Sequence, residues 1–184
     1  ETSKGFDIGV EYYNAQGMRL EAVYFDQVVE DEIYYDLDAY TGYLQALGTG
    51  YSQGLEVSGE YPFIGGVTLT GNYTYNDTER PEGELRSRRP KHLANFGLSY
   101  VTLHDKLTLN ATLRLARDAE NEVFGLGYVP LDDYEVLNLS ANYQLVESME
   151  IFARIENASN ERYQEVSDFN TSGAAIYAGM RVSF

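Results

Sequence analysis

The sequence predicts an all-β fold, an antiparallel transmembrane β-barrel of up-and-down strands, to which these 184 residues contribute about nine strands. Three observations support this prediction. Apolar and polar residues alternate with a period of two along nearly every segment, as the side chains of a strand do. Short turns and long loops alternate strictly between the segments, which is the asymmetry of outer-membrane barrels. No segment shows a sustained helical period or approaches the roughly 18 consecutive apolar residues of a membrane helix.

The first four strands are expected at residues 5–13, 20–35, 44–61 and 67–76. Every second residue is apolar or small in the first and the fourth, and the residues between them are mostly Gly, Asp, Glu, Thr and Asn. The second strand is less regular, because Val23 and Phe25 fall on its polar side. In the third, the alternation is clear from Leu55 onward.

The next four strands are expected at 94–100, 107–115, 137–145 and 149–156. Their apolar side is rich in Leu, and their other side carries Thr, Asn, Ser, Gln, Arg and Glu, which fits a lipid-facing belt around a polar interior. A soluble sandwich would also alternate, but its strands are usually about five to six residues long. The segments here are mostly about ten residues long, the usual length for a barrel strand, so we favour the membrane barrel.

The last expected strand runs from Ile176 to Phe184. Its alternate residues are all apolar, and it ends on an aromatic residue at the chain terminus. Aromatic side chains concentrate at the membrane interfaces of outer-membrane barrels. Taken alone, this strand fits a half-buried strand of a soluble sandwich equally well, so the prediction depends on the other strands.

Four short turns are expected at 14–17, 62–66, 104–106 and near 147–148, and four long loops lie between them. If the chain ends on the periplasmic side, the turns are periplasmic, the loops are extracellular, and nine strands place residue 1 outside the cell. Bacterial single-chain barrels have an even number of strands. We therefore expect residues 1–184 to be the C-terminal part of a larger barrel.

Composition restricts the possible functions. The chain has no cysteine, which excludes a disulfide framework and a thiolate metal site. Its formal net charge of −16 argues against nucleic acid as a partner, because phosphates would be repelled. His92 and His104 are the only histidines, and no Ser-His-Asp spacing or nucleophile elbow is visible. We expect no catalytic residues, no metal site and no cofactor.

Five stretches carry a resemblance to a known family. They are Asp31–Tyr35, Gly50–Val57, the Arg-Pro-Lys-His run at Arg89–His92, the stretch Ile155–Tyr163 with Asn157 as its first asparagine, and the terminal Phe184. Together they resemble the last barrel strands of TonB-dependent outer-membrane receptors, over essentially the whole chain. The stretch at 157–163 with the terminal Phe is the most specific part. Ala158-Ser159 departs from the commoner Leu-Phe of that family.

The resemblance implies that the chain holds the last nine of 22 strands in the outer membrane of a Gram-negative bacterium. It implies active import of a scarce small-molecule ligand, often a ferric siderophore, and an energising partner, TonB, that contacts a plug domain outside this chain. Outer-membrane lipid and lipopolysaccharide are further expected partners. The alternative is a barrel without energised transport, acting as a passive channel, an adhesin or a structural binding protein.

Candidate ligand-binding residues lie in the expected loops. Arg86 and Arg88 belong to a basic loop, and arginine suits carboxylate and phosphate recognition. Tyr128 and Phe169 are loop aromatics that could stack on a ligand. The basic loop also fits a generic strand start, and aromatics near strand ends also serve as interfacial anchors, so both readings stay open.

Two further groups of charged residues are given structural roles. Carboxylates gather on or near the first long loop, where Ca²⁺ binding is possible, but the spacing matches no EF-hand and a solvated loop is favoured; they are Glu30, Asp31, Glu32, Asp36 and Asp38. Three arginines on separate strands are predicted to face the barrel lumen and to pair with Glu56, Glu60 or a plug; they are Arg114, Arg154 and Arg181.

Overall fold

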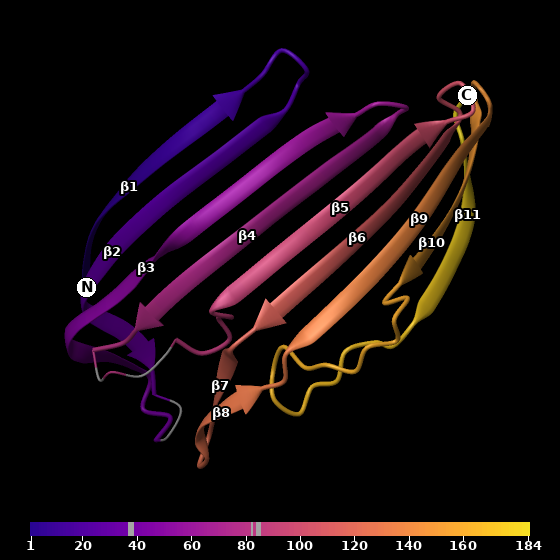
Figure 1. Ribbon diagram of the computed structural model, residues 1–184. Helices are drawn as coiled ribbons and strands as arrows, with labels where there is room; N and C mark the ends of the chain where they lie inside the picture. Colours follow the sequence, from indigo (N-terminus) through magenta and orange to yellow (C-terminus); the bar gives the residue numbers. More distant parts are fainter. Residues whose placement is uncertain (37–38, 82, 84–85) are drawn as a thin grey trace.

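Nine strands form a single antiparallel sheet in a computed structural model of the protein, which describes residues 1–36, 39–81, 83 and 86–184 (Figure 1). The sheet follows the sequence, in the order β1-β2-β3-β4-β5-β6-β9-β10-β11, and β7 and β8 pair separately as a hairpin. The strand bounds are β1 Thr2–Tyr13, β2 Arg19–Tyr35, β3 Tyr43–Phe63, β4 Val67–Glu79, β5 His92–Thr102, β6 Leu107–Arg117, β7 Ala119–Val123, β8 Gly127–Leu131, β9 Tyr134–Val146, β10 Met149–Glu156 and β11 Ala175–Val182. Within the described residues no helix is long and apolar enough to cross a membrane.

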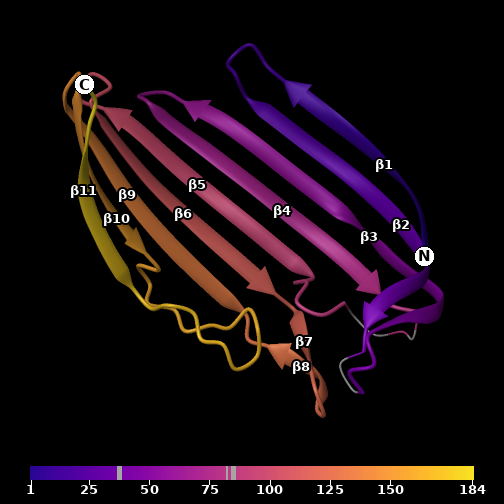
Figure 2. The ribbon, with the colours of Figure 1, turned by 180° about the vertical axis from the view of Figure 1, so that it is seen from behind.

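The two ends of the sheet differ as predicted. Short turns and the C-terminus lie at one end, here called the turn end, and the long connections and the N-terminus lie at the other, called the loop end (Figures 1 and 2). Hydrogen bonds to one side chain hold the first turn, residues 14–17, in a tight conformation. The Asn14 side-chain oxygen accepts hydrogen bonds from the backbone N–H groups of Gln16 (3.0 Å) and Met18 (2.9 Å), and Gly17 adopts φ +87°.

The structure corrects three details of the expected strands. Pro62, expected in a turn, pairs with Thr68 near the end of β3, where the hydrogen bond that a proline cannot donate costs the sheet little. β11 ends at Val182 and not at Phe184, although the Ser183 N–H still donates to the Ser148 carbonyl (2.9 Å). The loop expected between 115 and 133 contains the β7–β8 hairpin.

The sheet has one apolar and one polar side, as the alternation predicted. Large apolar side chains are exposed along the apolar side; Phe6, Ile8 and Val10 of β1, for example, are 59%, 66% and 67% exposed. Among the described residues only four hydrophobic side chains are buried, Ala46, Ala116, Tyr134 and Val136. A water-soluble domain would bury its apolar residues in a core, so this apolar side suits a lipid environment.

Two aromatic rings on the polar side cover glycines of neighbouring strands. Phe25 faces Gly54 across the β2–β3 pair, and Phe152 faces Gly179 across the β10–β11 pair. A Cβ placed on either glycine would lie 2.6 Å from the ring Cζ atom. The irregular position of Phe25 in the sequence is therefore a packing feature: the ring fills the space that a glycine leaves.

Candidate functional site

The last long loop, residues 157–174, is organised by one buried side chain. Asn157 is 5% exposed and adopts φ +49°, a backbone conformation that asparagine tolerates better than most residues. Its side-chain oxygen accepts from the Glu161 N–H (2.8 Å), and its side-chain nitrogen donates to the carbonyls of Glu161 (2.9 Å) and Ser172 (3.1 Å). Both halves of the loop are thereby tied to the end of β10.

The middle of this loop packs against the polar side of the sheet. The rings of Tyr163 and Tyr134 lie 4.1 Å apart, beside the small buried cluster of Ala116, Tyr134 and Val136. The Glu165 carboxylate accepts hydrogen bonds from the Tyr134 hydroxyl (2.7 Å) and from the Arg114 guanidinium (3.1 Å). The loop therefore lies over the polar side of β6 and β9.

Two hollows border this contact. The strand hollow, of about 480 Å³, is lined by polar residues of β6, β9 and β10 and by the last loop; its lining includes Asn110, Thr112, Arg114, Arg154, Glu156 and Tyr163. The mouth hollow, of about 280 Å³, lies at the loop end and is lined by charged residues of several segments; its lining includes Arg88, Arg114, Arg117, Asp132, Tyr134 and Glu165. Arg114 lines both hollows, so it stands at the boundary between them.

The basic loop, residues 80–91, is held between β2 and the β7–β8 hairpin. Arg86 pairs with Glu32 of β2 (2.5 Å), and Arg88 donates from Nε to the Asn121 side-chain oxygen of β7 (2.6 Å). The Arg80 guanidinium lies 5.0 Å from the centre of the Tyr34 ring and donates to the Tyr128 hydroxyl (3.1 Å). These contacts join the basic loop, β2 and the β7–β8 hairpin into one unit.

Arg80 keeps its charge in this unit. Its burial lowers the pKa, but the hydrogen bond with the Tyr128 hydroxyl and the negative charges of Glu122 and Glu32 outweigh this effect and raise the pKa overall. A permanently charged guanidinium can therefore hold Tyr34, Glu122 and Tyr128 together at any physiological pH.

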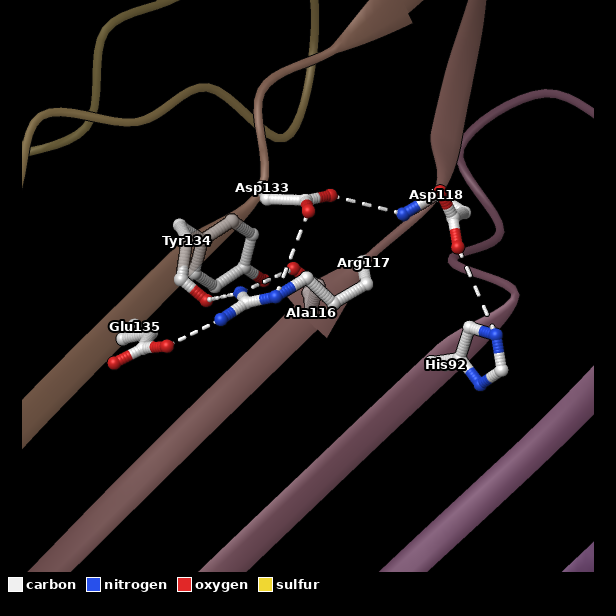
Figure 3. A network of polar contacts seen from close by, with 7 residues as sticks. All are labelled: His92, Ala116, Arg117, Asp118, Asp133, Tyr134 and Glu135. Atoms are coloured by element: carbon white, nitrogen blue, oxygen red, sulfur yellow. Dashed lines mark hydrogen bonds and ion pairs between the residues drawn. The ribbon is translucent and has the colours of Figure 1, made fainter.

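Arg117 organises the rim where β6, β7 and β9 meet (Figure 3). Its guanidinium donates to the carbonyls of Ala116 (3.1 Å) and Tyr134 (2.8 Å) and to the Glu135 carboxylate, and it pairs with Asp133 (3.5 Å). Asp133 also accepts from the Asp118 N–H (3.0 Å), and the Asp118 carboxylate lies 3.6 Å from His92 Nε2. The fork of one arginine thus fixes the base of the β7–β8 hairpin.

Three of the four predicted ligand-binding residues, Arg86, Arg88 and Tyr128, take part in the contacts of the basic loop, and Phe169 lies apart in the last loop. Arg88 also lines the mouth hollow. Phe169 is 72% exposed in the last loop. Their roles in ligand binding stay predictions.

The other charged groups can also be placed. Glu32 pairs with Arg86, and Asp36 accepts from the backbone N–H of Ala39 and the hydroxyl of Thr41, while Asp38 lies outside the described residues. These contacts suit a structured loop, and the described residues hold no group of three His, Cys, Asp or Glu side chains placed to bind a metal ion.

Of the partners predicted for the lumen-facing arginines, Glu56 and Glu60 were wrong, and pairing with a plug stays a prediction. Arg114 pairs with Glu165 (3.1 Å), Arg154 with Glu156 (3.3 Å) and Arg181 with Glu150 (2.8 Å), not with Glu56 or Glu60. Sequence reasoning missed Glu165, Tyr163 and Arg117 as site residues. Tyr163 was visible as the last residue of the motif at 157–163, but no periodic signal marks the other two.

A sheet that is apolar on one side and polar on the other, with short turns at one end and long loops at the other, has the architecture of an outer-membrane β-barrel. The family described as "TonB dependent receptor-like, beta-barrel" matches residues 1–158, and the chain belongs to this family. The members are receptors and transporters of the Gram-negative outer membrane and not enzymes. Comparison with curated protein sequences finds no match.

Solved structures confirm the fold. The chain is similar to the pyoverdine outer membrane receptor FpvA from Pseudomonas aeruginosa PAO1 bound to pyoverdine, at 17% identity and a TM-score of 0.82, over 99% of this chain and 30% of that one. It is also similar to the ferric enterobactin receptor PfeA from Pseudomonas aeruginosa (19%, TM-score 0.80, 99% and 31%). The FrpB iron transporter from Neisseria meningitidis gives 15% identity and a TM-score of 0.78, over 99% and 31%. The chain thus spans less than a third of the length of these receptors.

Proposed function

We propose that this chain forms the C-terminal part of a receptor for energised, TonB-coupled uptake of a scarce ligand, specifically a ferric siderophore. The observation that carries the proposal is the mouth hollow, which opens at the loop end beside a second hollow on the polar side of the same strands. In a closed barrel the polar side faces the lumen. A ligand held at the loop end would therefore lie above the lumen.

The chemistry of the hollows favours a chelate over a bare metal ion. The described residues offer no metal-binding group, whereas Arg88 and Arg114 present guanidinium groups that suit carboxylates and phosphates. Ferric siderophores with carboxylate or catecholate donors are anionic. The similarity to FpvA, PfeA and FrpB is consistent with such a ligand.

The remaining partners belong to this proposal. TonB would act through a plug domain outside this chain. The apolar side would contact outer-membrane lipid, and the loop end of the barrel would lie among lipopolysaccharide headgroups.

The test uses the full-length gene that encodes this segment. A deletion strain should lose uptake of ⁵⁹Fe supplied as a ferric siderophore in iron-limited medium, and the full-length gene should restore it. Uptake should also disappear in a strain that lacks TonB. If uptake persists without TonB, or if the deletion strain grows and takes up every ferric siderophore tested as the parent does, the barrel without energised transport is the better interpretation.

A further inference from the structure

The Arg114–Glu165 pair lies at the boundary between the mouth hollow and the strand hollow. Both residues line the mouth hollow, and Arg114 also lines the strand hollow. Arg114 is on the polar side of β6, and Glu165 is on the last loop, 51 residues further along the chain. A ligand that moves from one hollow to the other would pass this pair.

The pair is accessible and weakly held. The Arg114 and Glu165 side chains are 48% and 51% exposed, so solvent and salt screen their attraction. By contrast, Arg117 in the same hollow is engaged by two carboxylates and two carbonyls. An incoming anion can therefore take over Arg114 more easily than Arg117.

The loop can release Glu165 without losing its attachment to the barrel. Its ends are tied by Asn157 and by Asn160, whose side-chain oxygen accepts from the Ala174 N–H (3.0 Å). The middle is folded on itself, since Gln164 bonds with the Asn170 side chain (2.9 Å) and the Asp168 N–H (3.0 Å). The Tyr163 ring and the Glu165 carboxylate join this middle part to Tyr134 and Arg114.

We infer that the Glu165 carboxylate is an internal substitute for an anionic group of the ligand. It occupies Arg114 when no ligand is present, and an anionic chelate takes its place, with Arg88 on the same wall as a second cation. Loss of the Glu165 contact frees the middle of the last loop and opens the boundary between the two hollows. The inference rests on the proposed function for the identity of the ligand, but the loop contact can be tested without a ligand.

The first experiment measures hydrogen exchange by mass spectrometry on the full-length receptor in detergent. Glu165→Gln removes the charge, so the amides of residues 162–170 should exchange at least threefold faster than in the wild type. Glu150→Gln is the matched control, because Glu150 pairs with Arg181 on the same side of the sheet at the turn end. Unchanged exchange in Glu165→Gln would refute the inference, whatever the ligand.

The second experiment measures binding of two probes by fluorescence quenching: a ferric tris-catecholate of charge −3 and an uncharged ferric trihydroxamate. Glu165→Gln should bind the anionic probe three- to tenfold more tightly than the wild type, because its internal competitor is gone. Arg114→Gln should bind the anionic probe at least tenfold more weakly, and Glu150→Gln should bind like the wild type.

The two experiments separate the inference from the proposed function. If the receptor binds neither probe while Glu165→Gln accelerates loop exchange, the siderophore proposal fails and the loop contact stands. Two results would overturn the idea that Glu165 competes with an anion. In one, Glu165→Gln raises the affinity for both probes equally; in the other, Arg114→Gln leaves the affinity for the anionic probe unchanged.

Discussion

Asn157 shows how much structure a single polar side chain can determine. It is buried, it adopts a left-handed backbone conformation, and its amide group bonds to both halves of a long loop. An alanine would leave the Glu161 N–H and the carbonyls of Glu161 and Ser172, all partly buried, without these partners and would tolerate the backbone poorly.

We therefore predict that Asn157→Ala lowers the free energy of opening of the last loop by about 2–4 kcal/mol, from lost hydrogen bonds and backbone strain together. Asn157→Gly relieves the strain but not the lost bonds, so it should recover about 1 kcal/mol of this. The measurement is hydrogen exchange at the amides of Ala158 and Glu161 in the full-length receptor. Asn142→Ala, on the same polar side, is the control and should leave these amides unchanged.

Arg117 gives a second prediction at this scale. Its planar fork reaches two backbone carbonyls and two carboxylates at the base of the β7–β8 hairpin, and lysine cannot reproduce that geometry. Arg117→Lys should loosen the hairpin by about 1–2 kcal/mol, and Arg117→Gln by more. A glutamate-specific protease should then cut at Glu120 or Glu122 faster than in the wild type. Arg154→Lys, in an exposed pair, should not change the cleavage rate; if Arg117→Lys also leaves it unchanged, the fork is dispensable.

At the scale of strands, the aromatic–glycine pairs differ in what surrounds the glycine. The three atoms nearest to a Cβ on Gly179 all belong to the Phe152 ring. A Cβ on Gly54 would meet the Phe25 ring and also lie 2.0 Å from the Tyr75 carbonyl oxygen. A smaller side chain in place of Phe152 would remove the clash at Gly179, whereas the clash with the Tyr75 carbonyl at Gly54 can be relieved only if the strand backbone shifts.

We predict that Gly54→Ala and Gly179→Ala each destabilise the barrel by about 1–3 kcal/mol, as overpacked sites do. Phe152→Leu should rescue most of the effect of Gly179→Ala, and Phe25→Leu should fail to rescue Gly54→Ala. Urea titration of the full-length receptor in detergent, read by the folded band on unheated gels, measures all the variants. Rescue of Gly54→Ala by Phe25→Leu would show that the backbone adapts and that the ring is the whole obstacle.

Strands were predictable from the sequence because each carries its own signal. The alternation around Leu109 or Leu139 specifies both the strand and its apolar side, so the nine-stranded sheet and its turn-and-loop asymmetry were foreseen. The long connections were not. Arg86 pairs with Glu32, 54 residues away in the sequence, and Arg114 pairs with Glu165, 51 residues away. No local sequence pattern predicts contacts at such separations. The β7–β8 hairpin was missed for a related reason, since its strands are only five residues long.

At the scale of the whole molecule, the sheet is open and does not close on itself. β1 and β11 lie at its two ends, and each offers an unpaired edge, while the apolar side from Phe6 to Val10 is exposed. In lipid every backbone group needs a partner, so a sheet with two unpaired edges is unstable there, and in water its apolar side favours aggregation.

Residues 1–184 expressed alone should therefore form aggregates or mixed oligomers in detergent, and no discrete pore. Size-exclusion chromatography with light scattering, followed by planar-bilayer recording, measures this. A monodisperse monomer with clean single-channel conductance would show that these nine strands close on themselves, and the receptor assembly proposed above would then have to be abandoned in favour of a small barrel.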